Sequence, residues 1–304
     1  MAAEYQDTDW RVVDYQPFCL DEAIMDRSTK RPLFIRGPRP ARLETGGYFV
    51  VLGAAQTFGR FCARPFATML QERLDLPVLN VSHGGAGPAF FCGDNARLID
   101  YLNGARFVVI QVMSGRSDSS SLFESDGVGY FSRKSDGARL GCDEAFAELI
   151  RSGSKRVLSQ IVSETRFNWC ASYESLVSKI AVPTILLWFS TRKPKYRQGW
   201  NSLSALFGAF PQLVDARMIS AIRPLFDRYV ECVTTRGLPQ RLADRFTGEQ
   251  TTVTDPWTSR PWTENWYYPT PEMHEDAALA LETVCRALSA RPLANAERHY
   301  GAPT

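Results

Sequence analysis

The stretch YFVVLGAAQTFG at residues 48–59 decides the fold that we predict for this chain. Its apolar start, residues 48–52, has the length of a strand, and the small residues that follow it predict a tight turn. A helix is expected from Pro65, which suits a first helical position, to Leu74. A second strand at residues 77–81 runs into a glycine-rich turn. Together these elements predict a right-handed βαβ unit.

Further apolar runs of strand length follow at residues 106–113, 184–190 and 229–233. Strands that are covered on both faces of a parallel sheet are typically apolar almost throughout. Helical spacing of apolar residues occurs at residues 94–102, 212–225 and 271–288. The sequence therefore predicts an α/β fold, a single-domain three-layer sandwich with about five parallel strands. The turns after these strands are expected to open into one crevice at the carboxyl edge of the sheet.

The composition limits the classes of partner. The 35 basic and 33 acidic residues leave a net charge of +2, which gives no support for nucleic acid as a partner. The 7 cysteines include no C-x-x-C pair, so we expect reduced thiols in a cytoplasmic protein, with neither a metal nor a cofactor. There is no signal-peptide pattern and no apolar run of roughly 18 residues, so no membrane association is expected. Nothing in the sequence predicts the oligomeric state.

The flanking segments are assigned by their composition. Residues 1–45 are polar and rich in proline, which predicts an arm that packs on a domain of residues 46–290. Arg36 and Arg39 in this arm are expected to be solvent-exposed charges. Residues 291–304 are polar and are expected to form a frayed tail.

Two internal segments depart from the alternation of strands and helices. Residues 122–180 contain helical patterns at 142–150, 155–161 and 174–180, which predicts an insertion that covers the crevice. Residues 234–270 contain no convincing element and predict a long, lid-like loop. This loop holds Trp257, Trp262, Trp266, Tyr267 and Tyr268. Its aromatic rings either form a platform for a ligand or seal the edge of the sheet.

A family resemblance emerges from the turns. The pattern strand-G-x-x-x-T-x-G at Gly53, followed by N-x-x-x-x-G from Asn80 to Gly85, resembles the first two blocks of the SGNH (GDSL-type) hydrolases. The segment Gly53–Pro65 and the run YPTPEMHED at residues 268–276 are similar to an uncharacterised bacterial family with degenerate SGNH motifs. The SGNH resemblance covers roughly residues 48–290 and implies the same α/β fold.

The motif residues of the SGNH hydrolases are only partly present. That family has an Asp-Ser pair after the first glycine, with the serine as nucleophile, whereas this chain has Ala54 and Ala55. The third block, Gly-x-Asn-Asp, aligns near Ser117 and Asp118, so the asparagine donor of the oxyanion hole is missing. The final Asp-x-x-His block precedes the last helix of those enzymes, and His274 matches its histidine.

The candidate site follows from this comparison and from the predicted topology. We expect His274, Thr57 and Gln56 to be catalytic, because a histidine near a crevice is the usual acid–base group. His274 lies on the apolar stripe of the last helix, and we expect it to approach the Gly53 turn. The expected substrate-binding residues are Ala55, Gly85, Arg116, Ser117 and Arg192.

The sequence leaves three functions open. The first is an enzyme of altered SGNH type that hydrolyses or transfers an ester-like group on a carbohydrate or related small molecule without a serine nucleophile. The second is a sulfotransferase-like transferase, because a strand followed by Thr191-Arg192-Lys193-Pro194 and later Ser202 is similar to the phosphate-binding motif of those enzymes. The third is a non-catalytic protein, a pseudoenzyme, that binds a ligand with the same fold.

Overall fold

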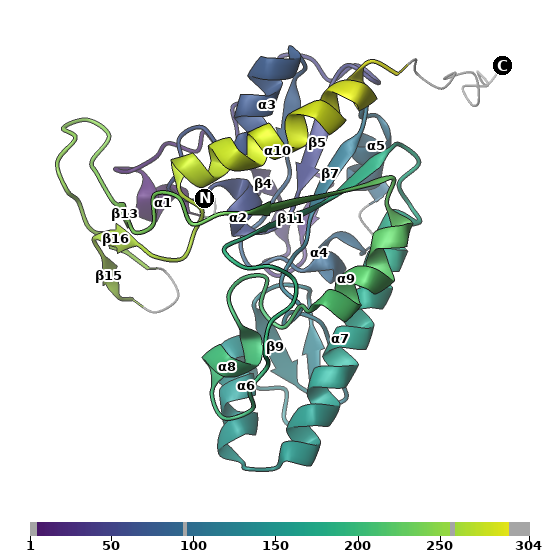
Figure 1. Cartoon of the computed structure of the whole chain (residues 1–304), viewed down its shortest axis with the longest axis vertical. Coiled ribbons are helices and arrows are strands. Elements are labelled where there is room, and N and C mark those ends of the chain that lie inside the picture. The colour runs from purple at the N-terminus through teal and green to yellow at the C-terminus, as the bar shows by residue number, and fades with distance from the viewer. Residues whose placement is uncertain (1–4, 94–95, 256–258, 292–304) are drawn as a thin grey trace.

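The computed structural model describes residues 5–93, 96–255 and 259–291. Its centre is a parallel sheet of five strands in the order β12-β11-β7-β5-β6. The strands are β5 (Phe49–Leu52), β6 (Val78–Asn80), β7 (Val108–Gln111), β11 (Thr184–Ser190) and β12 (Arg228–Val233). The α/β prediction is therefore confirmed, with each strand inside or within one residue of its predicted apolar run (Figure 1).

Helices cover both faces of the sheet because its side chains are apolar on both sides. Phe49 and Val51 pack against α3 (Phe66–Leu74) and α10 (Pro271–Ser289), which lie side by side (Figure 1). Val50 and Leu52 lie in the core on the opposite face. That face is covered by α4 (Pro88–Phe91), α5 (Ala96–Asn103), α7 (Lys155–Val177) and α9 (Ala216–Ile222).

The N-terminal segment contains α1 (Gln6–Asp9) and two short antiparallel pairs. These pairs are β1 (Phe18–Cys19) with β4 (Phe34–Ile35) and β2 (Met25–Asp26) with β3 (Arg31–Pro32). Arg36 follows β4 and is only 4% exposed, so the expectation that it is a solvated charge is wrong. Its guanidinium donates to the carbonyl oxygens of Phe58, Gly59, Cys62 and Ala63. Helix ends leave such carbonyls without partners, and Arg36 supplies donors for them after α2 (Ala55–Phe58).

The insertion contains a small sheet that the helical patterns did not predict. Its strands are β8 (Phe123–Ser125), β9 (Tyr130–Arg133) and β10 (Arg139–Gly141), paired antiparallel. With α6 (Cys142–Arg151) and the start of α7 they enclose a separate cluster of buried apolar side chains. The insertion extends away from the main sheet toward the bottom of Figure 1. Strands of three or four residues are too short for their alternation to be recognised in a sequence.

Two other segments differ from their predictions. The helix predicted at 212–225 starts later, because Asp215 caps α9 by accepting hydrogen bonds from the backbone N–H groups of Arg217 and Met218. It ends in the short η1 (Arg223–Leu225), and α8 (Leu203–Phe207) precedes it.

The aromatic loop, residues 234–270, contains more regular secondary structure than expected. It contains the antiparallel pairs β13 (Gln240–Arg241) with β16 (Glu264–Asn265) and β14 (Val253–Thr254) with β15 (Pro261–Trp262). Trp257, Asp94 and all of the predicted tail except Arg291 lie outside the described residues. Of the helices that the structure describes, none combines the length and the apolar character that a membrane span requires.

Candidate functional site

The turn after β5 is tied to β7 by Gln111. The Gln111 Oε1 atom accepts hydrogen bonds from the Ala54 backbone N–H at 3.1 Å and from the Thr57 hydroxyl at 2.8 Å. A Cβ atom at Gly53 would lie only 2.6 Å from that same oxygen, so glycine is required at this position. The catalytic role of Thr57 stays a prediction, since in this structure its hydroxyl proton is directed at Gln111.

The same turn buries groups that a polar ligand can use. Gln56 is 3% exposed, and its Oε1 atom has no hydrogen-bond partner within the described part of the chain. Ala54 and Ala55 are also buried and carry no nucleophilic atom. Because buried polar groups are normally hydrogen-bonded, Gln56 marks a position where a ligand or a water molecule would find a partner.

The loop after β6 is hydrogen-bonded to the first turn. Asn80 donates to the Thr57 carbonyl, and the backbone N–H of His83 donates to the Gly53 carbonyl. Gly85 has φ +73°, and a Cβ there would lie 3.2 Å from the backbone nitrogen of Gly129 in the insertion. The turns after β5 and β6 therefore meet, as the parallel topology predicts.

His83 was missed as a candidate by the sequence analysis. Its Nε2 atom lies 4.0 Å from Asp26 Oδ2, and its ring stacks on Phe90 with centroids 4.8 Å apart. Among the described residues, His83, and not His274, is thus the histidine whose backbone is hydrogen-bonded to the turn after β5. Its place inside the N-x-x-x-x-G block could have identified it as a candidate from the sequence.

The loop after β7 places Ser117 and Asp118 in buried positions. The Ser117 carbonyl accepts a hydrogen bond from the Ser125 hydroxyl at 2.7 Å. Asp118 Oδ1 accepts one from the Ser172 hydroxyl at 2.8 Å. Burial raises the pKa of Asp118 to about 6, although the bond from Ser172 opposes this shift. Asp118 is therefore a carboxyl group able to exchange a proton near neutral pH.

Arg192 is committed to the protein backbone. Its five N–H groups donate to the carbonyl oxygens of Lys193, Pro194, Ala209, Pro211 and Val214. An arginine side chain has only five donors, so none is left for a ligand in this arrangement. Burial lowers the pKa of Arg192 to about 10.

His274 is enclosed in the core on the α10 face of the sheet. Its ring lies 5.9 Å from that of Phe66 and 5.4 Å from that of Phe189. Its Nδ1 atom accepts a hydrogen bond from the Phe66 backbone N–H at 3.3 Å, and its exposure is 0%. Burial, with a smaller effect of the Arg36 charge, lowers the pKa of His274 to about 3.

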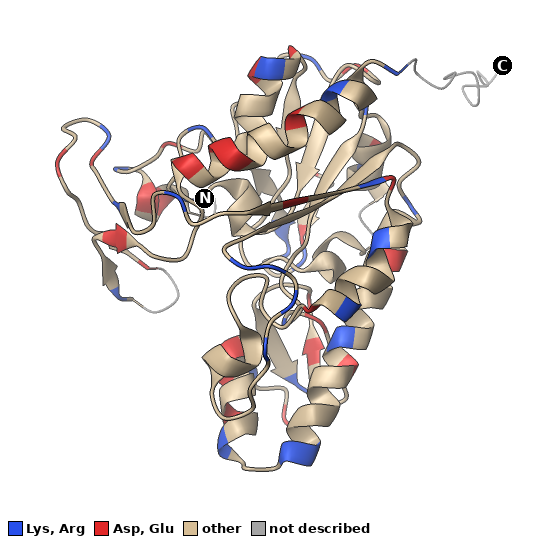
Figure 2. Ribbon diagram, in the orientation of Figure 1, with Lys and Arg blue, Asp and Glu red and all other residues tan. Residues whose placement is uncertain are grey.

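The acidic residues at the start of α10, red in Figure 2, have other partners. Asp276 accepts a hydrogen bond from the Thr234 hydroxyl at 2.6 Å and pairs with Arg236. Arg236 also pairs with Glu275 at 2.9 Å. No hydrogen bond, ion pair or ring contact among the described residues joins His274 to Gln56 or Thr57. Its catalytic role remains a prediction.

A second pair of residues has the spacing expected of the Asp-x-x-His block. Asn265 and Tyr268 stand directly ahead of α10, whereas His274 lies inside that helix. Asn265 Oδ1 accepts hydrogen bonds from the backbone N–H groups of Tyr267 and Tyr268. The Tyr268 hydroxyl accepts one from Arg60 at 3.0 Å. Only the spacing of Asn265 and Tyr268 matches the Asp-x-x-His block, because neither residue type matches it.

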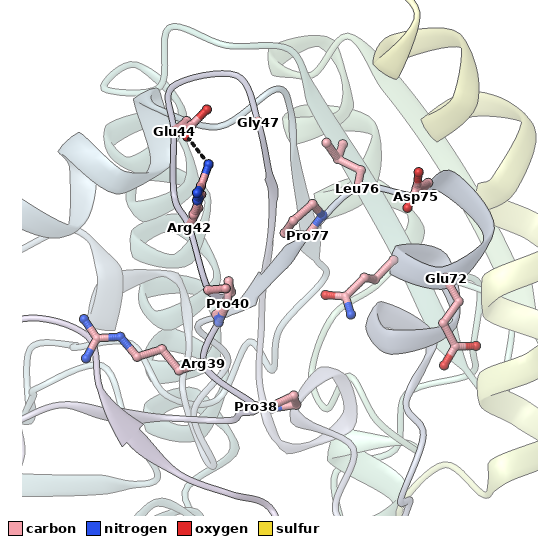
Figure 3. Close-up of a pocket in the computed structure, with 12 residues that line it drawn as sticks. Pro38, Arg39, Pro40, Arg42, Glu44, Gly47, Glu72, Asp75, Leu76 and Pro77 are labelled. Atoms are coloured by element: carbon pink, nitrogen blue, oxygen red, sulfur yellow. Dashed lines mark ion pairs between the residues drawn. The ribbon is translucent and has the colours of Figure 1, made fainter.

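A cavity of about 630 Å³ lies at the opposite, amino edge of the sheet. It is lined by residues that precede β5 and β6, such as Gly47 and Pro77, and by the segment Pro38–Arg42 (Figure 3). Arg42 pairs with Glu44 of the same segment at 3.7 Å (Figure 3), and Glu72 pairs with Arg64. None of the predicted site residues lines this cavity.

Comparison with known proteins gives a family but no activity. The family model described as "Domain of unknown function (DUF6473)" matches residues 19–125 and 146–289. No curated protein matches the chain.

Among solved structures, the chain is similar to a carbohydrate esterase family 2 enzyme with a carbohydrate-binding domain from Corynascus thermopiles (Myceliophthora fergusii). The identity is 12% and the TM-score 0.41, over 86% of this chain and 70% of that chain. A candidate SGNH hydrolase from Slackia heliotrinireducens has 17% identity and a TM-score of 0.36, over 78% of this chain and 98% of that chain. An acetyl xylan esterase from Butyrivibrio proteoclasticus has 12% identity and a TM-score of 0.40, over 84% of this chain and 66% of that chain. These likenesses are too remote to transfer a substrate or a reaction.

Proposed function

The chain belongs to this family of unknown function, DUF6473, and from its own residues we propose that it binds a carbohydrate or related small polar molecule at the carboxyl edge of the sheet. The observation that carries the proposal is the set of buried polar atoms without hydrogen-bond partners in the described residues at this edge. They include Gln56 Oε1, Ser82 Oγ, Gln111 Nε2, Asp118 Oδ2 and Gln212 Oε1. Native proteins rarely leave such groups unsatisfied, so a hydroxyl-rich ligand is a fitting partner.

Exposed aromatic faces support a sugar rather than a smaller polar molecule. Trp266 is 68% exposed and Tyr267 is 40% exposed, next to each other on the aromatic loop. Trp262 and Tyr268 instead pack around the buried Arg60. The loop thus combines a sealing part with an exposed part, in which Trp266 offers a ring for a ligand and Tyr267 packs edge-on against Tyr268.

Binding is better supported than the two catalytic functions. A hydrolase of altered SGNH type would need His274 to activate water or an acceptor hydroxyl, but the imidazole is buried and its pKa is lowered to about 3, which makes it a weak base. A sulfotransferase would need Arg192 to bind phosphate, and all five of its donors are used by carbonyl groups.

We expect p-nitrophenyl acetate and acetylated xylan to be hydrolysed no faster than in a protein-free control. The reason is that residues 54 and 55 carry no nucleophile, and acyl transfer needs one. The double variant Ala54→Asp with Ala55→Ser is measured beside the unmodified protein, because it rebuilds the Asp-Ser pair. Labelling of the unmodified protein by a fluorophosphonate, abolished by mutating a single serine, would contradict this expectation.

We expect the Trp266→Ala variant to bind oligosaccharides about 2- to 13-fold more weakly, since an aromatic contact contributes about 0.5–1.5 kcal/mol. A glycan array of neutral and acidic oligosaccharides identifies ligands, and isothermal titration calorimetry then gives the dissociation constants. The matched control is Phe246→Ala, because Phe246 is 61% exposed and packs on Trp10 instead. If no glycan binds to the unmodified protein, the carbohydrate proposal is wrong.

A further inference from the structure

Arg116 is a mostly enclosed cation with open donors. It follows β7, and its side chain is 19% exposed. Its Nε atom lies 3.1 Å from Asp143 Oδ1 at the start of α6, and its guanidinium carbon lies 5.9 Å from the centre of the Phe207 ring. Among the described residues, no side chain or carbonyl takes a hydrogen bond from Nη1 or Nη2. These two nitrogens carry four of the five N–H donors of an arginine.

The Gln212 side chain also has an end without a hydrogen-bond partner, near the loop that carries Arg116. The Gln212 backbone carbonyl accepts a hydrogen bond from the Gly115 backbone N–H at 2.8 Å, which places this residue next to the loop after β7. The side chain is 6% exposed, and its Nε2 atom lies 2.5 Å from the Tyr267 hydroxyl. The other end of the amide has no partner within the described residues. If the amide oxygen and nitrogen exchanged places, one end of the amide would still have no hydrogen-bond partner.

Tyr267 joins the two groups from the aromatic loop. Tyr267 is linked to this region through its hydroxyl, which accepts a hydrogen bond from Gln212, and burial opposes while the Asp143 charge raises the pKa of Arg116. The ion pair with Asp143 lies at the Nε atom of Arg116, and the Asp143 side chain is itself 58% exposed. Three segments distant in sequence thus converge: the loop after β7, the residues before α9 and the aromatic loop.

We infer that Arg116, Gln212 and Tyr267 form a subsite for the anionic group of an acidic sugar, a carboxylate or a sulfate ester. This inference rests on the proposed carbohydrate binding and adds the charge of the ligand. The guanidinium fork matches two oxygens of such a group in parallel hydrogen bonds. The open end of the Gln212 amide is placed to bond a neighbouring sugar hydroxyl, and Tyr267 offers a ring and a hydroxyl at the rim.

The test compares an acidic oligosaccharide with its neutral ester and with a sulfated oligosaccharide of a different sugar backbone. Isothermal titration calorimetry at low salt uses tetragalacturonate, its fully methyl-esterified form and a sulfated carrageenan tetrasaccharide. We expect at least one anionic probe to bind about tenfold or more tightly than the neutral ester, because hydrogen bonds to charged groups contribute about 1.5–3 kcal/mol. Which of the two anions binds more tightly distinguishes the carboxylate from the sulfate ester.

Variants then assign the preference to these residues. Arg116→Gln is expected to remove the preference for the anion, so that the dissociation constants of the anion and the neutral ester come within about twofold of each other. Gln212→Glu is expected to weaken the binding of both probes, because Gln212 belongs to the proposed carbohydrate site, and to weaken the anion more, by placing a like charge beside it. The control Arg156→Gln makes the same charge change at an exposed residue of α7 and should keep the preference. Circular dichroism and the melting temperature confirm that each variant is folded.

The outcomes separate this inference from the proposed function. Equal binding of the charged and neutral probes, or a preference that survives in both Arg116→Gln and Gln212→Glu, overturns the anionic subsite and leaves carbohydrate binding intact. Binding of none of the three probes, together with an empty glycan array, overturns both.

Discussion

Replacing Arg60 by alanine is expected to lower the free energy of unfolding by about 3–5 kcal/mol, because the change leaves a buried carboxylate without its counter-charge. Arg60 and Asp9 both have side-chain exposures of 0%. Their two hydrogen bonds, from Nε at 2.8 Å and from Nη2 at 3.1 Å, form the bidentate arrangement typical of strong arginine–carboxylate pairs. Urea unfolding followed by tryptophan fluorescence measures the loss.

The surroundings of Arg60 explain why nothing can replace this partner. The guanidinium carbon lies 4.4–5.6 Å from the centres of four aromatic rings, and water has no access to the pair. These rings belong to Tyr5, Phe61, Trp262 and Tyr268. Arg60 therefore connects the N-terminal segment, the turn region after β5 and the aromatic loop.

The matched control is Arg64→Ala, four residues further along. Arg64 pairs with Glu72, but the two side chains are 62% and 48% exposed, so the expected loss is within about 1 kcal/mol. Equal losses for the two variants would contradict the assignment of Arg60 as the link that holds the aromatic loop to the domain.

The strands and their parallel direction could be predicted because the central runs are apolar throughout, as strands buried on both faces of a parallel sheet are. The run at residues 106–113 also contains one polar residue near its end. Gln111 is a polar side chain in an otherwise apolar strand, and it holds the turn after β5 through Ala54 and Thr57. A polar residue at the carboxyl end of a buried strand is thus a better indicator of the site than the loop residues around it.

The roles of the arginines could not be predicted from sequence. Arg36, Arg116 and Arg192 all stand in polar, loop-like segments. Only the fold shows that backbone carbonyls take up the donors of Arg192 and the Nη donors of Arg36, while Arg116 is paired with Asp143 at its Nε atom. Which donors are satisfied depends on chain segments that are distant in sequence, and no local pattern records them.

The buried state of His274 leads to a prediction about acid stability. Its pKa in the folded protein is about 3, below the ordinary value of 6.5. The unfolded chain therefore binds a proton near pH 6.5 that the folded protein does not accept until about pH 3. The contribution of the neutral His274 to the free energy of unfolding is therefore fully present above pH 6.5 and is lost as the pH falls toward 3. Other groups titrate in the same range, and Asp118, whose pKa is raised to about 6, acts in the opposite direction.

The His274→Asn variant isolates the histidine, because an asparagine oxygen can still accept the hydrogen bond from the Phe66 N–H. Between pH 7.5 and pH 5, the unmodified protein is expected to lose about 2 kcal/mol more stability than this variant, from ~1.4 kcal/mol per pH unit over the 1.5 units below pH 6.5. Urea unfolding at both pH values measures the difference, and the contribution of Asp118 cancels between the two proteins. His83→Asn serves as the control, since that imidazole is partly exposed at 14%. The same pH dependence in His274→Asn and the unmodified protein would mean that the imidazole can take up a proton while the protein is folded, as an acid–base catalyst must.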